Sequence, residues 1–148
     1  MVVYRVIISA IWWIFGLLII GTFGLMSLNQ ANFGLHTNDA LDWIFPQLIP
    51  TMTLTGVVAF LHEDPTPAPT TRGILFGFLL TCVISLFYLA AVATVIINAV
   101  SGTPAETQRG VVDALSGWNK FLGVFQGIAA AAVGAFFVRD GAILRATP

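Results

Sequence analysis

The stretch VIISAIWWIFGLLIIGTFGLMSL, residues 6–28, contains no charged residue. A helix needs about 20 mainly apolar residues to cross the hydrocarbon of a bilayer, so this stretch predicts a transmembrane helix. Its apolar run is longer than the roughly 7–15 residues of a signal peptide, and no A-x-A cleavage pattern follows it. We therefore expect the helix to be retained.

The composition of the whole chain favours the same environment. Of the 148 residues, 57% are hydrophobic and only 9% are charged, and the mean hydropathy is +0.92. A soluble domain carries roughly 25% charged residues, and a chain of this size cannot bury so much apolar surface in one aqueous core. The net charge of −1 gives no basic footprint for nucleic acid. Cys82 is the single cysteine, which excludes an intrachain disulfide and a CxxC redox or zinc centre.

Three further stretches can complete a bundle. Residues 73–100 and 119–138 are clear spans, whereas 43–61 is diluted by prolines and threonines. We include 43–61 because the basic residues then fall mainly on one side of the membrane. The prediction is an all-α integral membrane protein, a single domain over 1–148, built as a four-transmembrane-helix bundle with spans at about 6–28, 43–61, 73–100 and 119–138.

The basic residues predict the orientation of this bundle, since cytoplasmic loops carry an excess of Lys and Arg. They divide four against two: Arg5, Arg72, Arg139 and Arg145 on one side, and Arg109 and Lys120 on the other. Both termini are therefore expected in the cytoplasm, in a bacterial-type inner membrane or its equivalent.

A short amphipathic helix is expected on the external side, before the last span. Residues 103–106 (TPAE) form a capping box with proline at the first helical position. Val111, Val112 and Leu115 then share one face with Gln108. Trp43 and Trp118 are expected as aromatic belt residues at the same interface.

Small residues recur every four positions in two of the spans. The rows are Gly73, Gly77, Thr81 and Ser85 in the third span, and Gly123, Gly127, Ala131 and Ala135 in the fourth. Because helices in lipid associate through close backbone contact, such rows predict helix–helix contact surfaces. Packing within one chain and a seam between chains both remain open.

The second span contains two prolines, and each removes a backbone donor and clashes with the carbonyl four residues earlier. Pro46 and Pro50 therefore predict a kinked helix with free carbonyls. Gln47, Thr51 and Thr55 share one face of the same helix because of their four-residue spacing.

Counting 1.5 Å per residue inward from the external interface puts polar residues of two other spans at similar depths. Gln126 and Thr94 lie level with Thr51, about 12 Å down the helix, and Asn98 lies level with Gln47. We predict a polar intramembrane layer of Gln47, Thr51, Thr55, Thr94, Asn98 and Gln126. It either joins helices through hydrogen bonds or lines an uncharged pore.

Several classes of chemistry are disfavoured. No ionisable residue lies deep in a span, which argues against ion-coupled or proton-coupled transport. No GxSxG, P-loop, HExxH or dinucleotide fingerprint occurs, so an enzyme and a cofactor are not expected. His36, Asp39 and Asp42 have a spacing that metal ligands can use, but we interpret the acids as helix-dipole partners and predict no metal.

The run FPQLIPTMTLTG, residues 45–56, follows a first span and resembles the small four-helix subunits of tripartite solute transporters. The resemblance covers this run and the helix count, and no site residue is carried over from it.

The leading functional hypothesis is a non-enzymatic assembly component of the membrane. It either forms a homo-oligomer or serves as an accessory subunit of a larger membrane complex, so its partners are the bilayer and other membrane subunits or copies of itself. The alternative is a small uncharged channel or permeation subunit of a solute transporter. A third interpretation is a lipid- or quinone-binding subunit of an enzyme.

Overall fold

The computed structural model describes residues 2–28, 37–61, 72–102 and 108–145, and these ranges are helical except for a turn at Trp118, with no strand. The five helices are α1 (Val2–Leu28), α2 (Thr37–Leu61), α3 (Arg72–Gly102), α4 (Gln108–Gly117) and α5 (Asn119–Arg145). The prediction of an all-α protein is confirmed. The predicted capping box at 103–106 lies outside the described residues.

Three of these helices are long and apolar enough to cross a membrane: Val3–Met26 within α1, Arg72–Ser101 within α3 and Asn119–Phe137 within α5. The 24 residues in α1 span about 36 Å at 1.5 Å per residue, against about 30 Å of bilayer hydrocarbon. Their outer faces are covered with large apolar side chains, including Ile14, Leu18, Phe76, Val83 and Val124. Water would penalise a surface of this kind, whereas lipid solvates it.

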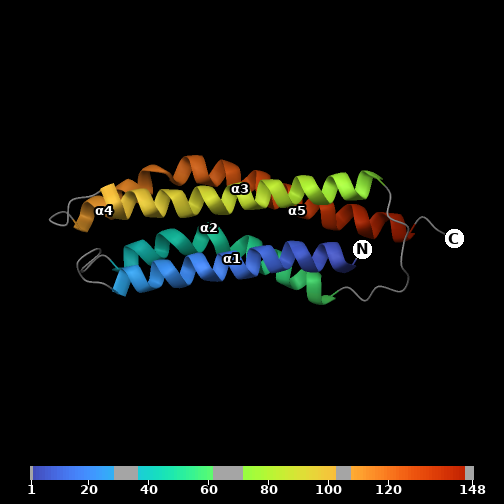
Figure 1. Cartoon of the computed structure of the whole chain (residues 1–148), viewed down its shortest axis with the longest axis horizontal. Helices are drawn as coiled ribbons and strands as arrows, with labels where there is room; N and C mark the ends of the chain where they lie inside the picture. The colour runs from blue at the N-terminus through green and yellow to red at the C-terminus, as the bar shows by residue number, and fades with distance from the viewer. Residues whose placement is uncertain (1, 29–36, 62–71, 103–107, 146–148) are drawn as a thin grey trace.

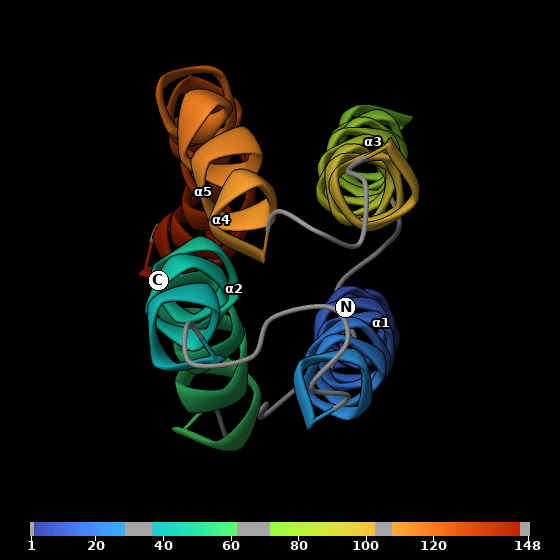
Figure 2. The ribbon, with the colours of Figure 1, turned by 90° about the vertical axis from the view of Figure 1, so that its left-hand side faces the viewer.

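The four long helices lie alongside one another, and α4 sits at one end of the bundle (Figure 1). The chain runs in one direction in α1 and α3, and in the opposite direction in α2 and α5, so α1 begins at the end where α5 finishes. Seen along the bundle, α1 and α2 form one pair, and α3 and α5 form the other (Figure 2). α2 is helical through both prolines, and its ribbon is bowed (Figure 1).

The α1–α2 pair is held at close range by two glycines, one on each helix. A Cβ atom added at Gly56 of α2 would lie 3.0 Å from Cζ2 of Trp13 on α1, and one added at Gly16 of α1 would lie 2.6 Å from Sδ of Met52 on α2. On each helix, therefore, a glycine makes room for a large side chain of the other helix. This exchange gives the close contact on which helix association in lipid depends.

α4 closes the end of the bundle opposite the N-terminus. Its predicted apolar face is confirmed, because Val111 and Leu115 are buried, and the helix packs against α2 and α3. A turn at Trp118 joins it to α5, where the Trp118 amide donates to the Leu115 carbonyl at 3.1 Å. Trp118 is exposed, as a belt residue would be, but the prediction for Trp43 was wrong: it is buried beside Phe23, with ring centroids 6.4 Å apart.

Replacement of Gly56 by Ala tests the close α1–α2 contact. The new methyl group meets the rigid Trp13 ring, so we expect the free energy of unfolding to fall by about 1–3 kcal/mol relative to the matched change Gly21→Ala. A Cβ atom at Gly21 has no neighbour within 4 Å. Titration with dodecyl sulfate in mild detergent, followed by circular dichroism, measures both variants. Equal stabilities would contradict this account of the contact.

Candidate functional site

The polar face of α2 points into the bundle. Gln47, Thr51 and Thr55 are 7%, 1% and 0% exposed. Pro46 and Pro50, in contrast, are exposed on the outer surface of the bundle. The four-residue spacing thus identified three side chains that the fold buries together. In lipid, such groups need hydrogen-bond partners from the protein itself.

The missing amide hydrogen of Pro50 leaves a carbonyl free for one of these hydrogen bonds. An α-helix would use the amide of residue 50 to bond the carbonyl of residue 46, and proline has no amide hydrogen. In the structure, Nε2 of Gln126 on α5 donates to the Pro46 carbonyl at 2.7 Å. A side chain from another helix therefore replaces the bond that the proline removes.

The next residue of α2 is bound by α3. The Tyr88 hydroxyl is 2.9 Å from the carbonyl oxygen of Gln47 and 3.1 Å from its Oε1, so the backbone and the side chain share one donor. The Tyr88 ring stacks on Trp12 of α1 with a centroid distance of 5.8 Å. The Trp12 indole in turn donates to Oγ of Ser85 at 3.0 Å. This chain of contacts connects α1, α2 and α3 through the buried centre of the bundle.

A second link joins α1 to α2 one turn further along. Oγ of Ser9 donates to the Thr55 carbonyl at 3.0 Å, and the Thr55 hydroxyl donates to the Met52 carbonyl of its own helix at 2.9 Å. Thr51 differs from its neighbours, because its buried hydroxyl has no hydrogen-bond partner. A helical threonine commonly bonds the carbonyl four residues earlier, and here that carbonyl, on Gln47, receives Tyr88.

Two members of the predicted layer lie elsewhere. Thr94 and Asn98 are on the exposed surface of α3, and the Thr94 hydroxyl donates to the Ala90 carbonyl of its own helix at 2.8 Å. Depth counted along the helix put α3 at the wrong level, because the α3 side chain that reaches Gln47 is Tyr88, ten residues before Asn98. It also carried no information on direction. At about 100° per residue, positions 94 and 98 point away from the face that carries Tyr88 and Val92. The inclusion of Thr94 and Asn98 in the layer was therefore wrong.

Sequence reasoning missed Trp12, Tyr88 and Ser9 as members of the polar network. Tyr88 has a detectable signal, because it lies three residues after Ser85, at the end of the small-residue row of α3, and so shares its face. The hydrogen bond from Trp12 to Ser85 has no sequence signature.

The two small-residue rows have different environments. In α3 the row faces other helices of the same chain: a Cβ atom at Gly77 would lie 3.7 Å from Phe136 of α5, and Ser85 bonds Trp12. In α5, Gly123, Gly127, Ala131 and Ala135 are all exposed. A Cβ atom at either of these glycines would meet nothing within 4 Å.

Metal ligands do not gather in the part of the chain that the structure describes: no three His, Cys, Asp or Glu side chains there are grouped to hold an ion. Asp39 lies in the first turn of α2, where a carboxylate stabilises the helix dipole. His36, the other member of the spacing considered above, lies outside the described residues.

Comparisons with known families, with curated proteins and with solved structures give no match for this chain.

The Tyr88 link can be tested by Tyr88→Phe, which removes the donor and keeps the ring on Trp12. We expect the free energy of unfolding to fall by about 0.5–2 kcal/mol, the range for one interhelical hydrogen bond in a membrane protein. Thr94→Val is the matched control, because it removes an exposed hydroxyl of the same helix that bonds only its own backbone. A loss in the control as large as in Tyr88→Phe would refute the assignment.

The unpartnered Thr51 hydroxyl gives a prediction of opposite sign. Thr51→Val keeps the shape of the side chain and removes a buried polar group that has no partner, so the bundle should become more stable by about 1 kcal/mol. The same dodecyl sulfate titration measures the effect. A loss of more than about 1 kcal/mol would mean that the hydroxyl has a partner in the membrane, such as a bound water molecule.

Proposed function

We propose that this chain is a non-enzymatic four-span membrane protein that assembles with copies of itself or with other membrane subunits. The observation that carries the proposal is the row Gly123, Gly127, Ala131 and Ala135 along the exposed side of α5.

The direction of the helices supports four spans. α1 and α3 are both apolar enough to cross a membrane, and they run in the same direction through the bundle (Figure 1). If both cross, the chain between them must return through the same thickness, and α2 is the helix in that position. α2 is less apolar, but its polar face is buried against α1, α3 and α5.

This threading puts the start of α1 and the end of α5 on one side of the membrane. The excess of basic residues assigns that side to the cytoplasm, in a bacterial-type inner membrane or its equivalent. α4 then lies at the external end, where its exposed polar side chains, such as Asp113 and Ser116, meet water.

The row on α5 supports assembly because it is exposed, whereas the corresponding row on α3 already faces other helices of the same chain. Small residues allow two helix backbones to approach closely, and in lipid this contact supplies much of the association energy. The α3 row makes that contact within the chain, while the α5 row offers the same kind of surface to the outside. A helix of a second protein can approach there without displacing a side chain at Gly123 or Gly127.

The alternative, an uncharged channel, receives less support from the same residues. Gln126 and Gln47 are engaged with the Pro46 carbonyl and with Tyr88, and Thr55 bonds its own helix. Trp12 and Tyr88 fill the space next to them and are almost completely buried. Polar side chains committed to one another in a packed core favour the structural role over the lining of a water path.

Gly127→Leu tests the assembly surface. The new side chain covers the row, so we expect the mass of the solubilised particle to fall towards that of one chain, or a co-purifying partner to be lost. Gly21→Leu adds the same bulk at an open site on α1 and should leave the mass unchanged. Light scattering in mild detergent and subunit cross-linking in membranes provide the measurement. A wild-type protein that is monodisperse, monomeric and free of partners would contradict the proposal.

A further inference from the structure

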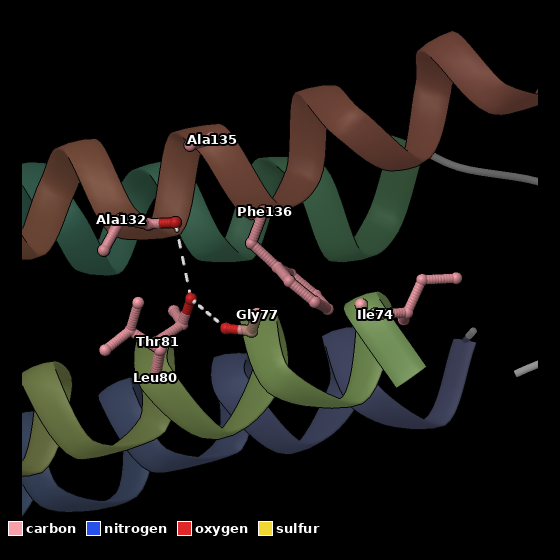
Figure 3. Close-up of a pocket in the computed structure, with 8 residues that line it drawn as sticks. Ile74, Gly77, Leu80, Thr81, Ala132, Ala135 and Phe136 are labelled. Carbon is pink, nitrogen blue, oxygen red and sulfur yellow. Dashed lines mark hydrogen bonds between the residues drawn. The ribbon is translucent and has the colours of Figure 1, made fainter. Parts of the chain in front are cut away.

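A groove lies between α3 and α5 near the end of the bundle where α3 begins. Gly73, Gly77 and Thr81 line it from α3, and Ala132, Ala135 and Phe136 line it from α5 (Figure 3). Its volume is about 170 Å³. It exists because Gly73 and Gly77 of α3, and Ala132 and Ala135 of α5, are small and leave a hollow beside Phe136. We refer to it as the α3–α5 groove.

The groove is open to the surroundings and apolar. Leu80, at its edge, is 47% exposed, and Ala135 is also exposed. The Thr81 hydroxyl already donates to the Gly77 carbonyl at 2.8 Å and lies 3.5 Å from the Ala132 carbonyl (Figure 3). Its one hydrogen is therefore committed to the protein backbone, and the wall of the groove favours a hydrocarbon occupant.

The dimensions suit a hydrocarbon segment rather than a helix. From Gly73 to Thr81 the groove follows α3 for about 12 Å, at 1.5 Å per residue. A cavity of about 150 Å³ is large enough to bind benzene, whereas an α-helix is about 10 Å across and needs far more room. A second copy of the chain would therefore not seat a helix in this space.

Positive charge marks the end of the groove. Arg72 is exposed and begins α3, next to Gly73, and helical side chains lean toward the N-terminus of their helix. The amino end of α3 adds the positive end of its dipole. Arg5 lies at the same end, 3% exposed, with its guanidinium carbon 5.8 Å from the centre of the Phe137 ring.

The acidic side chains that the structure describes are found at the other end. They are Asp39 and Asp42, at the start of α2, and Asp113 on α4. The acidic pair Glu63 and Asp64 lies outside the described residues, and the side chain of Asp140, near the end of α5, is not described either. Near the α3–α5 groove, the charged side chains that the structure describes are thus Arg72 and Arg5, and an exposed arginine such as Arg72 complements an anionic ligand.

We propose that the α3–α5 groove binds one anionic phospholipid. One acyl chain lies along the open side of the groove, beside Gly77 and Ala135, and the phosphate meets the Arg72 guanidinium at the membrane surface. Arginine suits this role because its planar fork donates two hydrogen bonds to one phosphate. With the orientation proposed above, the lipid belongs to the cytoplasmic leaflet, where anionic lipids add to the local negative potential.

The test uses the full chain in bilayer nanodiscs of equal parts phosphatidylglycerol and phosphatidylcholine, and native mass spectrometry counts the lipids retained after release into detergent. We expect one retained lipid per chain, mainly phosphatidylglycerol. Gly77→Leu fills the groove and should lower the retention of both lipids about tenfold. Ala90→Leu adds comparable bulk to an exposed site of α3 outside the groove and should match the wild type.

Charge variants separate the headgroup from the acyl chain. Arg72→Gln should retain lipid but lose about tenfold of its preference for phosphatidylglycerol, the factor that one charge-assisted hydrogen bond of ~1.4 kcal/mol provides. Lys120→Gln removes a positive charge at the opposite end and should change nothing. An unchanged headgroup preference in Arg72→Gln would overturn the assignment of the phosphate.

A substitution on α5 can also fill the groove. It serves as a second variant in case the substitution on α3 prevents folding. If Gly77→Leu fails to fold, as judged by size-exclusion chromatography and circular dichroism, Ala132→Leu takes its place. Retention in Ala132→Leu equal to that of the wild type would overturn the proposal. So would a wild type that retains no lipid while the groove variants lower its oligomeric mass, because the occupant would then be a second copy of the chain.

Discussion

Backbone polar groups have no water to bond inside a bilayer, and this constraint governs the bundle. α1, α3 and α5 satisfy their own carbonyls by being regular helices, whereas α2 carries two prolines that prevent it. The bond between Gln126 and the Pro46 carbonyl restores what Pro50 takes away. The central packing follows from this bond and its neighbour at Gln47, because both require α2 to lie against the α3–α5 pair.

The contacts within the α1–α2 pair differ in kind from the contacts between the two helix pairs. Within the α1–α2 pair the helices meet mainly through glycines and large side chains, with one hydrogen bond from Ser9 to the Thr55 carbonyl. Between that pair and the α3–α5 pair the connections around Tyr88 and Gln126 are hydrogen bonds, with Trp12 adding both a ring contact and a donor. Close packing is therefore most evident within the α1–α2 pair, and hydrogen bonds connect the two pairs.

Much of the architecture could be predicted from the sequence, because apolar length and four-residue spacing are local properties. The spans predicted at 73–100 and 119–138, which lie within α3 and α5, the apolar face of α4 and the inward face of α2 all follow from such patterns. Thr94 and Asn98 could not be placed in this way. The rotation of α3 about its axis is decided by which of its faces packs best, and buried Tyr88 and Val92 outweigh two polar residues that hydrocarbon or interfacial water can surround.

The same limit applies to the small-residue rows. Gly77 and Gly127 occupy similar patterns, and only the packed structure reveals that one faces a neighbour and the other faces outward. The sequence left both uses open, since a spacing of four identifies a common face without saying what covers it. The groove beside Gly77 is likewise a product of two helices together, so neither row predicts it alone.

The dependence of α2 on its partners has a consequence for biogenesis. During synthesis α2 leaves the ribosome before α3 and α5, yet the groups that bond Gln47 and the Pro46 carbonyl are supplied by those later helices. Until they arrive, α2 has little reason to prefer lipid over the insertion machinery or the membrane interface. With the four spans proposed above, the stable integration of α2 is a late event, completed from the carboxyl-terminal half of the chain, even though its sequence lies in the first half.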